Sequence, residues 1–254
     1  MAYDLQRASM WKRISAGLLD LILLVILSTG FLALLSLIDH YDRYQTAYEN
    51  YLLSYEEKYN TSFDYTEEEV NALPSEGRAR YDEAFKAFSS DSDVLYNYNM
   101  VLSLIVMNVT LAILFAYLIL EFIVPLILKN GMTIGKKIFS LGVMRTDCVR
   151  ITNLQVLVRF LLGKFTIETM IPVLLIIMFF FNIIDLLPVV IVIAGIFLLN
   201  LGIMIATRTN SCIHDVFAIT VVVDFPSQMI FDTEADLIHY KEKRAAEKAD
   251  STAY

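Results

Sequence analysis

The stretch ISAGLLDLILLVILSTGFLALLSLI, from Ile14 to Ile38, decides the fold class of this sequence. It holds 25 residues and one charge, Asp20. An α-helix rises about 1.5 Å per residue, so this run can cross roughly 30 Å of hydrocarbon with some tilt. Basic residues precede it, as they precede a signal peptide, but the run is too long for a signal-peptide core and lacks a small-residue cleavage site. We therefore predict that residues 1–38 are an N-terminal segment and a retained first span.

Three more apolar runs follow, and they predict spans at 100–128, 165–181 and 188–207. The last two are separated by the short loop 182–187, so they form a tight helical hairpin; a single bent re-entrant pair is the alternative. The whole chain is 57% hydrophobic, and its mean hydropathy is +0.57. We predict an all-α integral membrane protein with four transmembrane helices.

The basic residues predict the orientation of the spans. Fifteen of the 20 lie before span one, in segment 129–164 or in segment 208–254, and five lie in segment 39–99, beside fourteen acids. Short cytoplasmic segments are enriched in Lys and Arg. The sequence therefore predicts a protein of the cell membrane with both termini and segment 129–164 in the cytoplasm, and with segment 39–99 outside.

The outer segment 39–99 is acidic and rich in tyrosine. Five tyrosines recur at helical spacing and line one face of a helix that continues span one outward: Tyr41, Tyr44, Tyr48, Tyr51 and Tyr55. Thr66 and Glu69 form a predicted capping box, and a further helix is expected from Glu76 to Phe88. One interpretation is a helical cap whose aromatic side chains pack on each other. The other is an outer docking face, since tyrosine is a low-entropy contact residue.

Each span carries a polar side chain in its inner half. These are Asp20, Glu121, Glu168 and Asn200. Such residues are costly in lipid and usually face the protein interior, so we expect Asp20 and Glu121 to lie near each other. They either pair with Arg13, Arg159 or Lys164 and fix the helix register, or face a water-accessible cavity and bind a cation or relay protons.

The predicted cytoplasmic segments contain two short β-prone runs, Leu141–Thr146 and Ile219–Asp224, which we expect to pair as a two-stranded ribbon. Thr152 can cap a helix that carries Arg159. Residues 131–137 are glycine-rich and basic, but their glycine spacing differs from that of a phosphate-binding P-loop, and no Ser or Thr follows the lysine. The tail of segment 208–254 has the composition of a charged, solvated helix.

Three patches of the sequence occur in a fixed order. They are Arg13 to Asp20 at the start of span one, Thr133-Ile-Gly-Lys136 followed by Arg159, and Ser211-Cys-Ile-His-Asp215 followed by Thr220-Val-Val222. Together they resemble the RDD family of bacterial membrane proteins. The resemblance covers the membrane part and leaves out the acidic loop. It implies roles for Arg13, Asp20 and Asp215, and it implies transport, including cation/proton exchange, for some members. His214 is expected to be a structural histidine, and Asp215 to cap a helix or pair with Arg159.

The sequence contains no nucleophile–base pair and no nucleotide loop, so we expect no enzyme activity and no cofactor. Its two cysteines lack metal-ligand spacing, so no metal site is predicted. The expected partners are the lipid bilayer and either a protein partner or a second copy of the chain, with no nucleic acid. Two function classes remain: a non-enzymatic subunit or partner-binding scaffold, and a cation- or proton-coupled transporter centred on Asp20 and Glu121.

Overall fold

The computed structural model describes residue 6 and residues 8–252, with the side chains described up to residue 249. Arg7, counted above among the basic residues, lies outside the described residues. The chain forms two compact units. The larger comprises Met1–Ser28 and Ile113–Tyr254, and the smaller comprises Thr29–Ala112.

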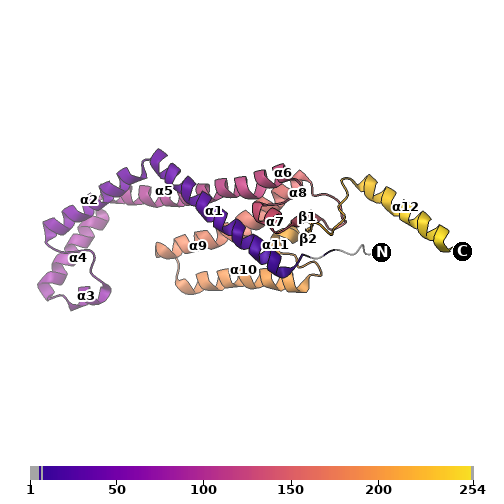
Figure 1. Ribbon diagram of the computed structural model, residues 1–254. Coiled ribbons are helices and arrows are strands. Elements are labelled where there is room, and N and C mark those ends of the chain that lie inside the picture. Colours follow the sequence, from indigo (N-terminus) through magenta and orange to yellow (C-terminus); the bar gives the residue numbers. More distant parts are fainter. Residues whose placement is uncertain (1–5, 7, 253–254) are drawn as a thin grey trace. The chain divides into compact units, whose positions relative to one another are not determined.

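The described residues contain four helices that are long and apolar enough to cross a membrane. They are Met10–Ile38, Ser92–Leu128, Asn153–Phe180 and Leu186–Ala206. Many of their apolar side chains, such as Leu18, Ile26 and Phe197, are exposed, as expected of residues that face lipid. The predicted all-α membrane fold is confirmed. The last two membrane helices form a hairpin, in which α9 (Ile171–Phe180) lies beside α10 (Leu186–Ala206) (Figure 1).

The first three helices have different bounds from those predicted. α1 (Met10–Ile38) ends before His40, which adopts a left-handed conformation, so α2 (Tyr41–Tyr59) is a separate helix and not a continuation of span one. The second helix begins with α5 (Ser92–Tyr117), eight residues earlier than predicted. The third begins at α8 (Asn153–Val158), capped by Thr152 as predicted, and continues unbroken to Phe180, so the helix that carries Arg159 and the predicted span 165–181 are one helix.

Two of the membrane helices contain π-helical segments. These are η1 (Leu118–Ile123), which leads into α6 (Val124–Leu128), and η2 (Arg159–Met170), which leads into α9. A proline follows each segment, Pro125 in one helix and Pro172 in the other. Proline has no N–H to bond the carbonyl four residues earlier, so the backbone carbonyls of Glu121 and Glu168 lose their usual helical partner. Both intramembrane glutamates therefore sit where proline interrupts the backbone ladder, and such π-segments frequently accompany functional sites.

The predicted ribbon is confirmed as an antiparallel pair of β1 (Leu141–Arg145) and β2 (Thr220–Asp224). β1 ends one residue earlier than predicted, and β2 starts one residue later because Ile219 has a positive φ of 55°. Val143 pairs with Val222 across the ribbon, and both are buried. Ala16 of α1 and Val156 of α8 join them in one apolar cluster. The ribbon thus forms the core at one end of the larger unit, which we call the ribbon end.

Two short helices of the larger unit lie next to the ribbon in sequence. α7 (Ile134–Ile138) precedes β1, and α11 (Ile213–Phe217) precedes β2. α7 contacts β1, and α11 contacts both β2 and η2. The charged tail forms α12 (Glu234–Thr252).

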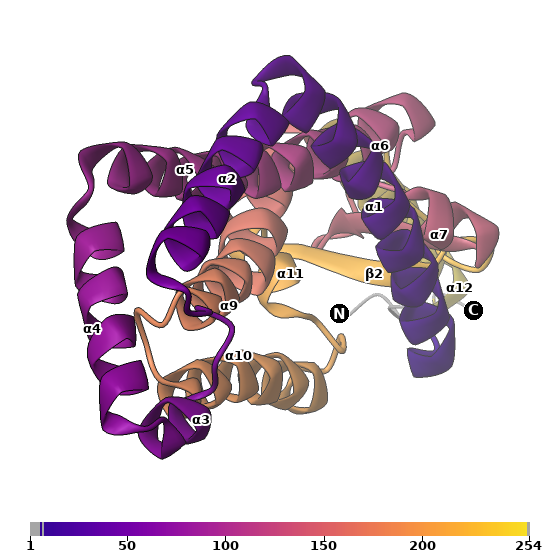
Figure 2. The ribbon, with the colours of Figure 1, turned by 90° about the vertical axis from the view of Figure 1, so that its left-hand side faces the viewer.

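The smaller unit contains α2, α3 (Glu67–Ala72) and α4 (Ser75–Ser90), with α3 following the loop from α2 and leading into α4 (Figure 2). Thr66 and Glu69 form the predicted capping box. Tyr48 and Tyr55 lie with their ring centroids 5.8 and 5.5 Å from that of Phe88 in α4. The Tyr55 hydroxyl donates a 2.7 Å hydrogen bond to Asp91.

The remaining tyrosines of this face are also half-buried. Tyr44 contacts Tyr96, and the Tyr51 hydroxyl lies 3.5 Å from an Asp93 carboxylate oxygen. Tyr41 is half-buried as well. The face is therefore largely used for packing within the unit, as in the first of the two interpretations.

Candidate functional site

Asp215 is the centre of a buried ion-pair network at the ribbon end. Its side chain is fully buried at the start of α11. One carboxylate oxygen lies 2.9 Å from Arg13 Nη2 of α1, and the other lies 2.5 Å from Arg159 Nη1 of η2. Arg159 Nη1 also donates to the Thr220 hydroxyl of β2 at 3.0 Å. One carboxylate therefore joins the first membrane helix, the third membrane helix and the segment after the fourth.

Asp20 holds α1 against the start of α7. Its two carboxylate oxygens accept hydrogen bonds from the Thr133 hydroxyl at 2.5 Å and from the Gly135 backbone N–H at 2.8 Å. A carboxylate at the N-terminus of a helix satisfies backbone N–H groups that have no partner within the helix. A Cβ on Gly135 would lie only 2.3 Å from the Ala16 carbonyl oxygen, so this close approach of α1 requires glycine.

Glu121 and Lys164 form a second ion pair, between the second and third membrane helices. Both side chains are largely buried. Each residue lies in a π-segment, so the pair connects η1 and η2 where both helices depart from regular α geometry.

Glu168 completes the network by contacting α11. Its carboxylate lies 2.8 Å from His214 Nδ1, and Asn200 of α10 also contacts α11. The Asn200 side-chain oxygen accepts a 3.0 Å hydrogen bond from the Ile213 N–H. A Cβ on Gly163 would lie 2.3 Å from His214 Cβ, so glycine is what allows α11 to lie directly on η2.

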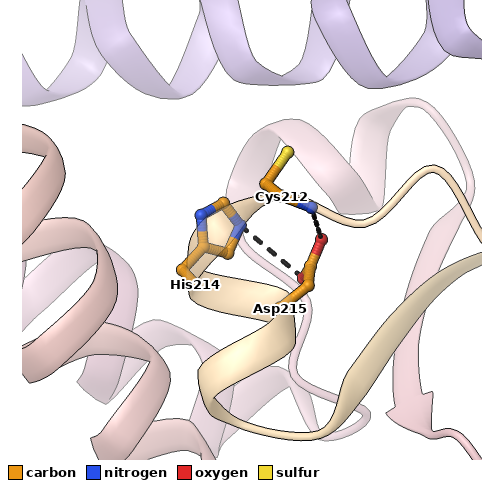
Figure 3. Close-up of side chains that lie close together, drawn as sticks. All are labelled: Cys212, His214 and Asp215. Carbon is orange, nitrogen blue, oxygen red and sulfur yellow. Dashed lines mark hydrogen bonds and ion pairs between the residues drawn. The ribbon is translucent and has the colours of Figure 1, made fainter. Parts of the chain in front are cut away.

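Cys212, His214 and Asp215 bring three ligand-type atoms within 4.8 Å of one another (Figure 3). Their other contacts make them a poor metal site. Two guanidinium groups already neutralise Asp215, and the Cys212 N–H donates to Asp215 Oδ2 at 3.0 Å as part of a helix cap. A bound cation would have to displace or tolerate both arginines. The cluster is better described as a capped helix start held by ion pairs.

The protonation states of these three residues follow from burial and charge. Burial alone would raise the pKa of the Asp215 carboxyl, but the charges of Arg159 and Arg13 outweigh it and hold that pKa well below its usual range. Burial lowers the pKa of His214. Burial and the Asp215 carboxylate raise the pKa of the Cys212 thiol. Asp215 is therefore ionised, while the imidazole and the thiol are neutral near pH 7.

The predicted polar residues lie at the same end of the larger unit, but they do not form one cluster, because each carboxylate has its own partners. The partner of Glu121 is Lys164, one of the three basic residues that were predicted as possible partners. Of the two alternatives for Asp20, the basic partner is not observed: a hydroxyl and a backbone N–H hold its carboxylate, and the side chain lines a cavity. Arg13 and Arg159 pair with Asp215, the pairing considered for Arg159.

Five residues at the site were not among the predicted polar residues of the spans: Thr133, Gly135, Lys136, Gly163 and His214. Thr133, Gly135 and Lys136 belong to one of the patches that resemble the family, and His214 belongs to another. The signal that could have found Gly163 is a glycine inside a helical pattern beside a lysine, since an interior glycine weakens a helix and often marks close packing.

The sequence pattern of the RDD family matches residues 7–219. The match includes every charged residue of the ion-pair network described above. No curated protein and no solved structure matches the chain.

Proposed function

Because the chain belongs to the RDD family, and the family match spans the whole ion-pair network, we propose that this network serves its function by holding the membrane helices in one fixed arrangement. The protein is then a non-enzymatic subunit or scaffold of a complex in the cell membrane. Its partner is a second protein or a second copy of the chain.

The observation that carries this proposal is that each carboxylate of the network already has a partner. Asp215 has two arginines, Glu121 has Lys164, Glu168 has His214, and Asp20 has Thr133 and Gly135. A carboxylate that carries a cation across a membrane must exchange its partners during the cycle. Buried ion pairs add little stability but can fix register, which is the property a scaffold requires.

A second candidate function, transport coupled to protons, is favoured by the contact between Glu168 and His214. Histidine is the side chain whose charge changes most readily near neutral pH, and buried carboxylate–histidine chains serve as proton relays in membrane proteins. His214 also lines a cavity at the ribbon end.

One experiment separates the two functions. The full chain is purified from its own membrane in a mild detergent, examined for a stoichiometric partner, and reconstituted in liposomes that contain a pH-sensitive dye. We expect a defined complex and no proton movement when Na⁺ or K⁺ gradients are imposed. Proton movement in the unmodified protein that disappears in Glu168→Gln at normal folded yield would establish transport instead. Protein-free liposomes are the control.

The proposed orientation places both termini in the cytoplasm, and it rests on the fifteen-to-five distribution of basic residues. Single cysteines at Asn60 and Lys243, both exposed, are introduced into a background in which Cys148 and Cys212 are replaced by serine. A membrane-impermeant maleimide added to intact cells is expected to label position 60 and not position 243. Labelling of position 243 before lysis would contradict the orientation, and labelling of both positions after lysis checks that each is reactive.

A further inference from the structure

A cavity of about 220 Å³ lies within the larger unit at the ribbon end. Apolar side chains form part of its wall, among them Ile14 of α1, Leu141 of β1 and Met204 of α10. Arg13 lines it near the start of the first membrane helix, and Met204 near the end of the fourth. The cavity is therefore at the depth where the apolar helices end, which is the level of lipid headgroups.

The charged groups that line this cavity are mostly basic. Four cations face it: Arg13, Lys136, Arg159 and Lys164. Asp20 is the only carboxylate among its described lining residues. The network as a whole is balanced, because Glu121, Glu168 and Asp215 supply three more negative charges, but none of these three lines the cavity. The local excess is thus positive on the cavity side.

Two of the lining cations have bonding capacity left over. The buried Lys136 ammonium makes one 3.3 Å hydrogen bond, to the Thr133 hydroxyl, and no carboxylate of the described residues lies within ion-pair distance of it. Arg159 is 5% exposed, and its Nη2 has no hydrogen-bond acceptor among the described residues. A buried donor without an acceptor is costly, and a bound anion would supply acceptor oxygens to both groups. Burial and the nearby Lys164 lower the pKa of Lys136 to about 8. A bound anion would stabilise the charged form of this ammonium group.

We propose that the cavity binds a phosphate-type oxyanion, held by Lys136 and Arg159. A tetrahedral oxyanion offers several acceptor oxygens, and arginine and lysine are the side chains that bind phosphate in proteins. The volume is smaller than the roughly 300–1,000 Å³ of sites for drug-sized ligands, which suits a single phosphate group. Basic pockets between membrane helices bind anionic headgroups on the cytoplasmic side, so the phosphate can belong to a lipid or be free.

The test compares Lys136→Gln with Lys137→Gln in the full chain. Lys137 is the neighbouring residue of the same short helix but is exposed, so it matches the charge change without touching the cavity. The thermal midpoint is measured in detergent with inorganic phosphate or with sodium chloride at equal ionic strength. It is also measured in nanodiscs of phosphatidylcholine alone or mixed in equal parts with phosphatidylglycerol.

We expect phosphate or phosphatidylglycerol to raise the midpoint of the unmodified chain and of Lys137→Gln. In Lys136→Gln the apparent affinity should fall by roughly ten-fold or more, as for the loss of a hydrogen bond to a charged group. A response to phosphate identifies a free oxyanion, and a response to phosphatidylglycerol alone identifies a headgroup.

Three results would overturn the proposal. Sodium chloride could reproduce the effect, which would indicate general charge screening. Both lysine variants could respond like the unmodified chain, which would indicate non-specific lipid contact. Alternatively, Lys136→Gln could lose folded yield without any ligand, which would give Lys136 a purely structural role. Since Lys136 has no ion pair to lose, its yield is expected to stay near that of Lys137→Gln.

Discussion

Asp215→Asn is expected to abolish most of the folded yield of the protein. The substitution leaves Arg13 and Arg159 buried without their shared counter-charge, and removing one partner of a buried ion pair costs about 3–5 kcal/mol. It also weakens the contact between α1 and α11, because Arg13 donates a 2.9 Å hydrogen bond to this carboxylate. Size-exclusion chromatography of the detergent extract and the thermal midpoint measure the loss.

Asp224→Asn provides the matched control for this variant. Asp224 also pairs with a basic residue of α1, Lys12, at 2.8 Å, but both side chains are substantially exposed. Exposed pairs contribute only about 0–1 kcal/mol, so this variant should fold nearly normally. Equal yields of the two variants would contradict the central role given to Asp215.

Gly163→Ala is expected to be the second most damaging change. The added methyl group would lie 2.3 Å from His214 Cβ and 2.6 Å from its Cα, a contact that no rotamer change can relieve. Helix α11 would have to move away from η2, and that movement would break the Glu168–His214 contact and strain the Arg159–Asp215 pair. Overpacking costs about 1–3 kcal/mol, and more where a backbone must shift. The thermal midpoint and the folded yield are the readouts.

Gly195→Ala and Gly202→Ala are the controls, because each glycine lies within α10 and nothing lies within 4 Å of the added methyl group. Alanine favours a helix interior over glycine by roughly 0.5–1 kcal/mol, so these variants should be at least as stable as the unmodified chain. If Gly163→Ala matched them, the close packing of α11 on η2 would be refuted.

The spans, the ribbon and the cap helices could be predicted because each depends on local pattern. Apolar runs of span length, a β-prone run such as Thr220–Asp224 and the capping box of Thr66 are all readable within a few residues. The third long helix begins at Asn153, before the predicted span 165–181. Arg159 and Lys164 lower the local hydropathy of the segment between, and their partners, Asp215 and Glu121, are distant in the sequence.

The pairing within the site could not be predicted because it depends on tertiary placement. Spacing along α1 places Arg13 and Asp20 on one face. In the structure, however, Arg13 pairs with Asp215, and Asp20 accepts a hydrogen bond from the start of α7. Nothing near Asp20 in the sequence indicates that a threonine hydroxyl and a glycine N–H will satisfy it. The sequence likewise does not indicate that Nη2 of Arg159 lacks an acceptor, because this depends on the positions of all its neighbours in the folded protein.

The ion pair between Arg13 and Asp215 joins residues that are 202 positions apart. Arg13 is synthesised long before Asp215. Helix α1 therefore enters the membrane before the carboxylate that pairs with Arg13 has been made. Contacts of such long sequence separation form late, because the chain must first lose a large loop entropy. Biogenesis of this protein therefore ends with a closing step, and chains cut short before α11 should remain open bundles that the quality-control proteases of the membrane can recognise.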